Sequence, residues 1–162
     1  MDLILWRHAD AEDAAPGKPD AARALTAQGV KQARRMAAWL GKRLSGEVLI
    51  VVSPAERAQQ TALALAKRFE TSREVGTAAE PQSVLKTAGW PDRDGTVVVV
   101  GHQPTLGQAA ALALTGEAAD WGVKKGAIWW IESRGQGEAR VRAVISPDML
   151  SSGKREARGE RR

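Results

Sequence analysis

Four side chains in this sequence are candidates for one site that binds an anion such as a phosphate group. Arg7 and His8 stand together near the first residue, Arg57 lies in the first half of the chain, and His102 lies in the second. A guanidinium group presents a planar fork of N–H donors that matches phosphate oxygens. A single arginine or histidine, however, is usually a solvated or structural residue. The case for a site therefore depends on whether the fold brings the four side chains together.

Each of the four side chains lies at or just after the end of a predicted strand. Residues 3–6, 48–52 and 96–100 are short apolar runs, rich in β-branched residues and without polar alternation. Such runs are typical of strands covered on both faces of a parallel sheet. In an open α/β sheet, ligands bind at the carboxyl ends of the strands. The sequence therefore predicts one concave cationic site, to which helix N-termini add backbone N–H groups.

Helical segments separate these predicted strands. Residues 30–44 carry an apolar stripe at 3.6-residue spacing, and Thr26 is the predicted N-cap. Residues 54–69 repeat the pattern, with a proline at the first helical position. We expect two further helices, a short one over residues 83–89 and a longer one over residues 104–114.

Residues 127–145 do not continue the alternation of strands and helices. Residues 127–131 and 139–145 flank a glycine-containing turn at 134–137, and the second run alternates apolar residues with Arg140 and Arg142. This pattern predicts a hairpin whose last strand has one solvated face. The expected fold is α/β, a three-layer α/β/α sandwich with a mainly parallel sheet and an antiparallel edge strand.

Composition places limits on function. The net charge is +5 and the isoelectric point is near 10, but the last twelve residues alone carry +3. We expect residues 1–150 to form a single domain and residues 151–162 to form a basic, disordered tail. Aromatic and basic residues do not interleave, so binding to nucleic acid is not expected. With no cysteine, no apolar stretch that could span a membrane and no signal segment, we expect a cytoplasmic protein without disulfides or a membrane association.

Several motifs together resemble a known family. Residues 5–10, Leu-Trp-Arg-His-Ala-Asp, resemble the Arg-His-Gly signature of the histidine phosphatase superfamily, whose fold is phosphoglycerate mutase-like. Residues 23–29 resemble its Leu-Thr-x-x-Gly motif, residues 53–62 its Ser-Pro-x-x-Arg-x-x-x-Thr-Ala motif, and residues 101–102 its late Gly-His. The resemblance extends to about residue 145. It is strongest to the SixA phosphohistidine phosphatase subgroup, and it implies that residues 1–150 are one histidine phosphatase domain.

The resemblance implies a role for each candidate. His8 would attack phosphorus in line and carry the phosphoryl group as a covalent phosphohistidine, which water then hydrolyses. Arg7, Arg57 and His102 would bind the transferred oxygens, a task for which a protonated His102 is more useful. Accessory positions in the matching motifs are Asp10, Arg23 and Ser53. No cofactor and no metal is expected, because the guanidinium groups supply the positive charge.

The sequence leaves the general acid open. Glu80 is the carboxylate nearest the position that the family uses, and it is either that acid or a solvated loop residue. Asp10 is either a second candidate or a brace for the loop that carries His8. A phosphohistidine leaves as imidazole, whose ring takes a proton from solvent near neutrality, whereas a phosphate ester must expel an alkoxide. A weak acid therefore favours an N–P bond in the substrate.

The expected substrate is a phosphorylated protein. Few residues separate Phe69 from Thr96, which leaves little chain to close over a small molecule. This indicates a phosphatase that acts on the phosphohistidine of a histidine phosphotransfer domain or another phosphoprotein. The alternatives are a small-molecule phosphomonoesterase and a non-catalytic phosphate-binding module. Lys124 and Lys125 are expected to be a solvated pair, or else to add positive charge for an acidic partner.

Overall fold

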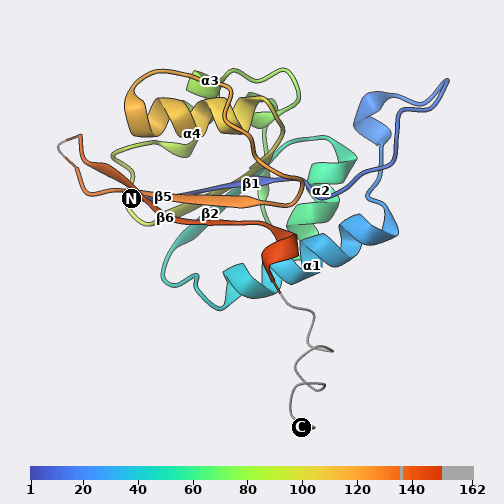
Figure 1. Cartoon of the computed structure of the whole chain (residues 1–162), viewed down its shortest axis with the longest axis horizontal. Helices are drawn as coiled ribbons and strands as arrows, with labels where there is room; N and C mark the ends of the chain where they lie inside the picture. Colours follow the sequence, from blue (N-terminus) through green and yellow to red (C-terminus); the bar gives the residue numbers. More distant parts are fainter. Residues whose placement is uncertain (136, 151–162) are drawn as a thin grey trace, which may run out of the picture.

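A six-stranded mixed sheet forms the middle layer of the fold (Figure 1). The structure is a computed structural model that describes residues 1–135 and 137–150. The strands are β1 (Asp2–Arg7), β2 (Val48–Val52), β3 (Glu70–Thr71), β4 (Thr96–Gly101), β5 (Ile128–Ser133) and β6 (Ala139–Ile145). Across the sheet they lie in the order β3-β2-β4-β1-β5-β6.

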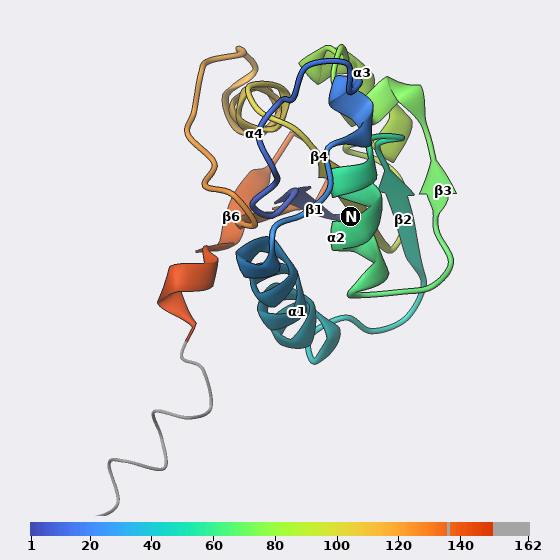
Figure 2. The same ribbon diagram turned by 90° about the vertical axis from the view of Figure 1, so that its right-hand side faces the viewer.

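Helices cover both faces of the sheet. Their bounds are α1 (Ala27–Gly41), α2 (Glu56–Leu63), α3 (Pro81–Ala88) and α4 (Thr105–Thr115), with short 3-10 helices η1 (Asp20–Ala22), η2 (Arg73–Val75) and η3 (Pro147–Met149). Figure 1 shows α3 and α4 on one face and α1 and α2 on the other. The loop from residue 8 to residue 24 lies at the end of the sheet that faces the viewer in Figure 2.

The apolar runs of the central strands are explained by two separate cores. Leu3 and Leu5 pack with α3 and α4, whereas Ile4 and Trp6 pack with α1 and α2. All four side chains are fully buried. Because successive side chains of a strand point to opposite faces, a strand covered on both sides must be apolar at every position.

Strand pairing confirms the predicted α/β architecture. β1 pairs with β4 in parallel, and β2 pairs in parallel with both β4 and β3. β5 runs antiparallel to β1, and β6 runs antiparallel to β5. Sequence analysis missed β3, because a strand of two residues is too short to show any periodicity.

The second predicted helix is shorter than expected. It was expected over residues 54–69, but α2 begins after its N-cap Ala55 and ends at Leu63. Phe69 lies beyond the helix, although it still packs against the core beneath α1 and α2. The helix is short because the chain must return to the sheet to pair β3 with β2. The predicted N-cap of α1 is confirmed, since the Thr26 hydroxyl accepts a hydrogen bond from the N–H of Gly29 at 3.0 Å.

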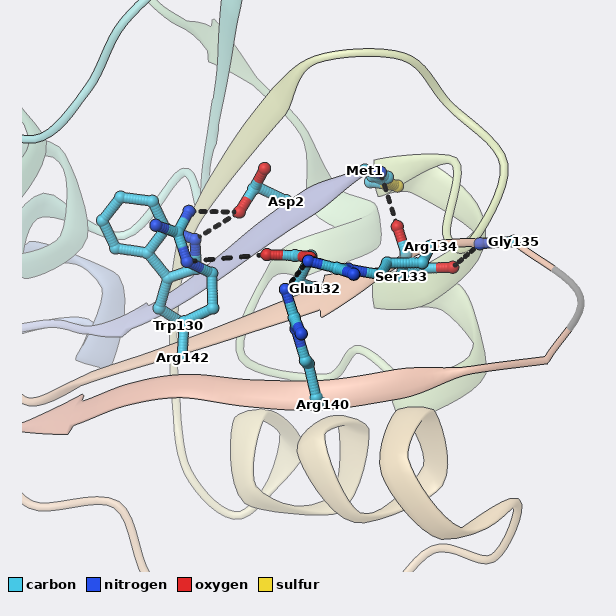
Figure 3. Close-up of polar contacts among 9 residues, drawn as sticks. All are labelled: Met1, Asp2, Trp130, Glu132, Ser133, Arg134, Gly135, Arg140 and Arg142. Carbon is cyan, nitrogen blue, oxygen red and sulfur yellow. Dashed lines mark hydrogen bonds and ion pairs between the residues drawn. The ribbon is translucent and has the colours of Figure 1, made fainter.

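The predicted alternation of β6 was wrong at its centre. A bulge interrupts its pairing with β5, so that Arg142 and Ala143 both lie on the Trp130 side and Val141 is 47% exposed. Figure 3 shows the result: the Arg142 guanidinium lies over the Trp130 ring, 4.6 Å from its centroid, and pairs with Asp2 at 2.9 Å. Bulges and charged side chains are common on edge strands, where they discourage pairing with another chain.

Two further expectations concern the whole chain. In the described residues, no helix has the length and apolar character that crossing a membrane would require. The predicted basic tail, residues 151–162, lies outside the described residues.

Candidate active site

His8 directly follows β1 and is held as a neutral imidazole. Its side chain is buried, and Nδ1 lies 2.7 Å from the carbonyl oxygen of Ala9. Because a carbonyl can only accept, Nδ1 carries the proton and Nε2 keeps its lone pair. Burial lowers the pKa of His8 to about 4; the hydrogen bond to Ala9 opposes this shift, and the charges of Arg57, Arg7 and Arg23 add to it. At neutral pH, Nε2 is therefore an unprotonated nitrogen that can act as a nucleophile.

Arg7 and Arg57 are each held from one side and leave another side without a partner. Arg7 Nη1 donates to the carbonyl of Val123 at 2.8 Å, and Arg57 Nη1 donates to the carbonyl of Asp20 at 3.0 Å. The Nε atoms of both arginines are buried and have no hydrogen-bond partner among residues 1–135 and 137–150. Buried donors of this kind are costly unless they meet an acceptor. Both side chains line the same cavity, where a group with several acceptor oxygens, such as a phosphoryl group, fits two guanidinium groups.

His102 directly follows β4 and is held by Ser53 at the end of β2. Its Nε2 lies 2.7 Å from the Ser53 Oγ, and this oxygen accepts a hydrogen bond from the N–H of Ala55. Nδ1 is buried and has no partner in the described part of the chain. The two histidine rings are close together, with centroids 5.2 Å apart.

The charge of His102 differs from the expectation. Burial, together with the charges of His8, Arg57 and Arg7, lowers its pKa to about 3, and the charge of Asp20 opposes this shift. His102 is therefore neutral at neutral pH rather than protonated, because burial first, and then the neighbouring cations, disfavour its charged form. A bound phosphoryl dianion would act against these charges and raise the pKa.

The four residues line one cavity of about 270 Å³, as expected from their positions at three strand ends. Arg23 also lines it, whereas Ser53 reaches it only through His102. Sequence reasoning did not find several other lining residues, because they lie in loops without a motif. The full lining consists of Arg7, His8, Ala11, Arg23, Arg57, Thr77, His102, Gln103 and Lys125.

Neither candidate acid lies in this cavity. Glu80 is exposed and immediately precedes α3. Asp10 accepts hydrogen bonds from the Thr26 hydroxyl at 2.7 Å and from Lys125 at 2.9 Å. These bonds, that from Thr26 first, lower the pKa of Asp10, so the structure supports its role as a brace for the His8 loop. Lys125 is not simply solvated, because it both holds Asp10 and lines the cavity.

A threonine in the third motif connects the two central residues. Thr61 Oγ1 accepts from the N–H of Ala9 at 3.1 Å and donates to the carbonyl of Arg57 at 2.7 Å. Thr61 thus ties the loop that carries His8 to the helix that carries Arg57. Among the residues described, no group of three or more His, Asp or Glu side chains could hold a metal ion.

Comparisons with known proteins place the chain in a family. The model of the histidine phosphatase superfamily (branch 1) matches residues 3–80. An uncharacterized protein of Picosynechococcus sp. is 33% identical to this chain, and the match covers 93% of this chain and 94% of that protein.

Solved structures extend the likeness to the whole fold. The structure of the protein histidine phosphatase SixA complexed with tungstate is similar, with a TM-score of 0.80 and 26% identity over 93% of this chain and 100% of that chain. A phosphoserine phosphatase mutant from Entamoeba histolytica shares the fold, with a TM-score of 0.70 and 17% identity over 93% of this chain and 99% of that one. The chain belongs to the histidine phosphatase superfamily and lies within its SixA-like group.

Proposed function

We propose that this protein is a phosphatase that hydrolyses phosphohistidine on a partner protein through a covalent intermediate on His8. One observation carries the proposal: the unprotonated Nε2 of a buried His8 shares a cavity with two arginines whose buried Nε donors have no partner in the described residues. The nucleophile and the groups that would bind the transferred oxygens are thus already arranged.

The reaction has two displacements at phosphorus. In the first, His8 Nε2 forms a bond to phosphorus while the N–P bond of the substrate breaks, and the substrate ring takes a proton from solvent and leaves as neutral imidazole. Arg7, Arg57 and His102 hold the three phosphoryl oxygens. The Nδ1–H of His8 keeps its bond to the Ala9 carbonyl, which stabilises the positive charge on the phosphorylated ring. In the second displacement, a water oxygen bonds to phosphorus while the bond from His8 Nε2 to phosphorus breaks, which releases dihydrogen phosphate and neutral His8 with its proton still on Nδ1.

The surroundings of the cavity favour an N–P bond over an ester. In the part of the chain that the structure describes, no Asp or Glu is among the residues that line the cavity. An alkoxide leaving group needs a positioned acid, whereas an imidazole leaving group can be protonated from solvent near neutral pH. The SixA structure to which this chain is similar is that of a protein histidine phosphatase, which supports the same substrate class.

A substrate panel tests the proposal. We expect the wild-type protein to release phosphate from a phosphorylated histidine phosphotransfer domain and to act poorly on phosphoserine, sugar phosphates and nucleotides. We expect H8A to lose turnover, and radiolabelled substrate to leave an acid-labile, base-stable label on the wild type but not on H8A.

A matched control is H102A, which retains the nucleophile and should still take up label, more slowly. Sugar-phosphate turnover that equals phosphohistidine turnover would identify a small-molecule phosphomonoesterase instead. Binding of the phosphoprotein without any turnover or label would indicate a non-catalytic phosphate-binding module.

A further inference from the structure

An acidic residue that no motif contains makes the main contact to Arg57. Arg57 Nη1 donates to the carbonyl of Asp20 at 3.0 Å, and Nη2 donates to its Oδ2 at 3.1 Å. Arg23 Nη1 pairs with the other carboxylate oxygen at 3.1 Å. The Asp20 side chain is 57% exposed, whereas that of Arg57 is 7% exposed. An exposed carboxylate in the loop before α1 therefore holds a buried guanidinium in α2.

This contact restrains the orientation of Arg57 beside the cavity that it lines. Asp20 engages both terminal nitrogens with its backbone and its side chain, and so fixes the plane of the guanidinium. The Nε edge is buried and has no partner among the described residues. A bidentate contact restrains the rotation of the group, so Arg57 lines the cavity in a preformed orientation toward a phosphoryl oxygen.

The same contact places a negative charge against the guanidinium of Arg57, which lines the cavity, although Asp20 itself does not line it. Hydrogen bonds, first from Arg23 and then from Arg57, lower the pKa of Asp20, so its carboxylate is ionised at neutral pH. An ionised carboxylate offsets part of the charge of Arg57 and repels a phosphate dianion. A hydrolase must release inorganic phosphate after each turnover, and a weaker hold on the product makes this release faster.

We propose that Asp20 is a positioning residue of the phosphoryl site, which fixes the orientation of Arg57 and whose charge weakens the binding of inorganic phosphate. This inference shares one premise with the proposed function, namely that the cavity binds phosphoryl groups. Its test uses inorganic phosphate itself and needs no substrate.

The experiment measures the Kd of inorganic phosphate by calorimetry on the full chain, with wild type, D20N, D20A and a control variant. The amide side chain of D20N keeps an oxygen that can accept from Arg57 Nη2 but carries no charge, so D20N should bind phosphate about five- to tenfold more tightly than wild type. D20A also lacks the charge but offers no side-chain acceptor, and it should bind phosphate less tightly than D20N. The control is D13N, which removes a carboxylate from an exposed position of the same loop and should stay within about twofold of wild type.

Each part of the proposal can fail separately. If D20N binds phosphate no more tightly than wild type, or if D13N tightens binding as much as D20N, the role of the Asp20 charge is wrong. If D20A binds as tightly as D20N, the Asp20 side chain does not position Arg57. If neither wild type nor D20N binds phosphate, the whole inference about Asp20 is wrong. The proposed function is decided separately, by the substrate panel and the label on His8.

Discussion

Burial beside cations, rather than the intrinsic pKa of an imidazole, determines the protonation state of the two histidines. Exposed histidine titrates near pH 6.5, which would leave a substantial fraction of the nucleophile protonated near neutrality. Burial lowers the pKa of His8 to about 4 and that of His102 to about 3, and the neighbouring arginines contribute to both shifts. The same arginines that would bind the phosphoryl group therefore also keep the nucleophile ready to attack.

Because the chain contains only His8 and His102, nuclear magnetic resonance can follow each of them without overlap. We expect neither ring of the untagged protein to titrate between pH 8 and pH 5.5, because protonation would bury a third cation beside two arginines. The ¹⁵N shifts of His8 should show a proton on Nδ1 and none on Nε2. The spectrum of H102A assigns the signals, and a titration midpoint near 6.5 for His8 would contradict the expectation.

The first turn of α1 and the loop that carries His8 lie unusually close together. A Cβ atom on Gly29, in the first turn of α1, would lie 1.9 Å from the carbonyl oxygen of Asp10. The N–H of Thr26, the N-cap of α1, also donates to this carbonyl. The helix and the His8 loop thus meet backbone to backbone, which explains why the second motif contains a glycine where a helix would ordinarily favour alanine.

G29A should therefore damage both the fold and the site. We expect a loss of about 1–3 kcal/mol in the free energy of unfolding, the range for an overpacked interior, together with lower phosphatase activity as the His8 loop is displaced. Urea unfolding and turnover measure the two effects. G41A is the matched control, because a Cβ atom at the last residue of α1 meets nothing within 4 Å. Its unfolding free energy should be unchanged or higher, and a G29A variant as stable and active as G41A would refute the argument.

For the whole molecule, keeping two histidines neutral makes stability depend on pH. The unfolded chain takes up protons on both histidines as the pH falls through about 6.5, whereas the folded chain does so only near pH 4 and pH 3. Where the unfolded state binds more protons, stability falls as the pH is lowered. The contribution of the neutral histidines is therefore present above pH 6.5 and is lost progressively below it.

We expect the free energy of unfolding to fall between pH 6.5 and pH 5 by about 1 kcal/mol per pH unit for each histidine. Urea unfolding in phosphate-free buffers measures this slope, and H8A or H102A should each remove about half of it. A slope that both variants share with wild type would show that other groups cause the acid sensitivity.

The sequence was sufficient for the features that depend on neighbouring residues. Apolar runs, the alternation in the last hairpin, helical periodicity and the Thr26 cap placed five of the six described strands and most helix positions. The ends of the first three of those strands marked Arg7, His8, Arg57 and His102 as candidates. Each of these signals repeats within one element, so local spacing reveals it. The ends of α2, the two-residue β3 and the bulge at Arg142 escaped detection, because pairing with a neighbouring strand determines them.

Contacts between distant loops became visible only in the folded chain. Asp20 meets Arg57 across 37 positions and Lys125 meets Asp10 across 115, and neither pair lies at a spacing that a helix or strand would produce. The neutral charge of His102 likewise depends on its burial, and then on charges that other elements bring beside it. The types of residue and their order along the chain thus identify the reactive groups. The orientation and protonation of these groups depend on which loops the sheet brings into contact. No local sequence pattern determines those contacts.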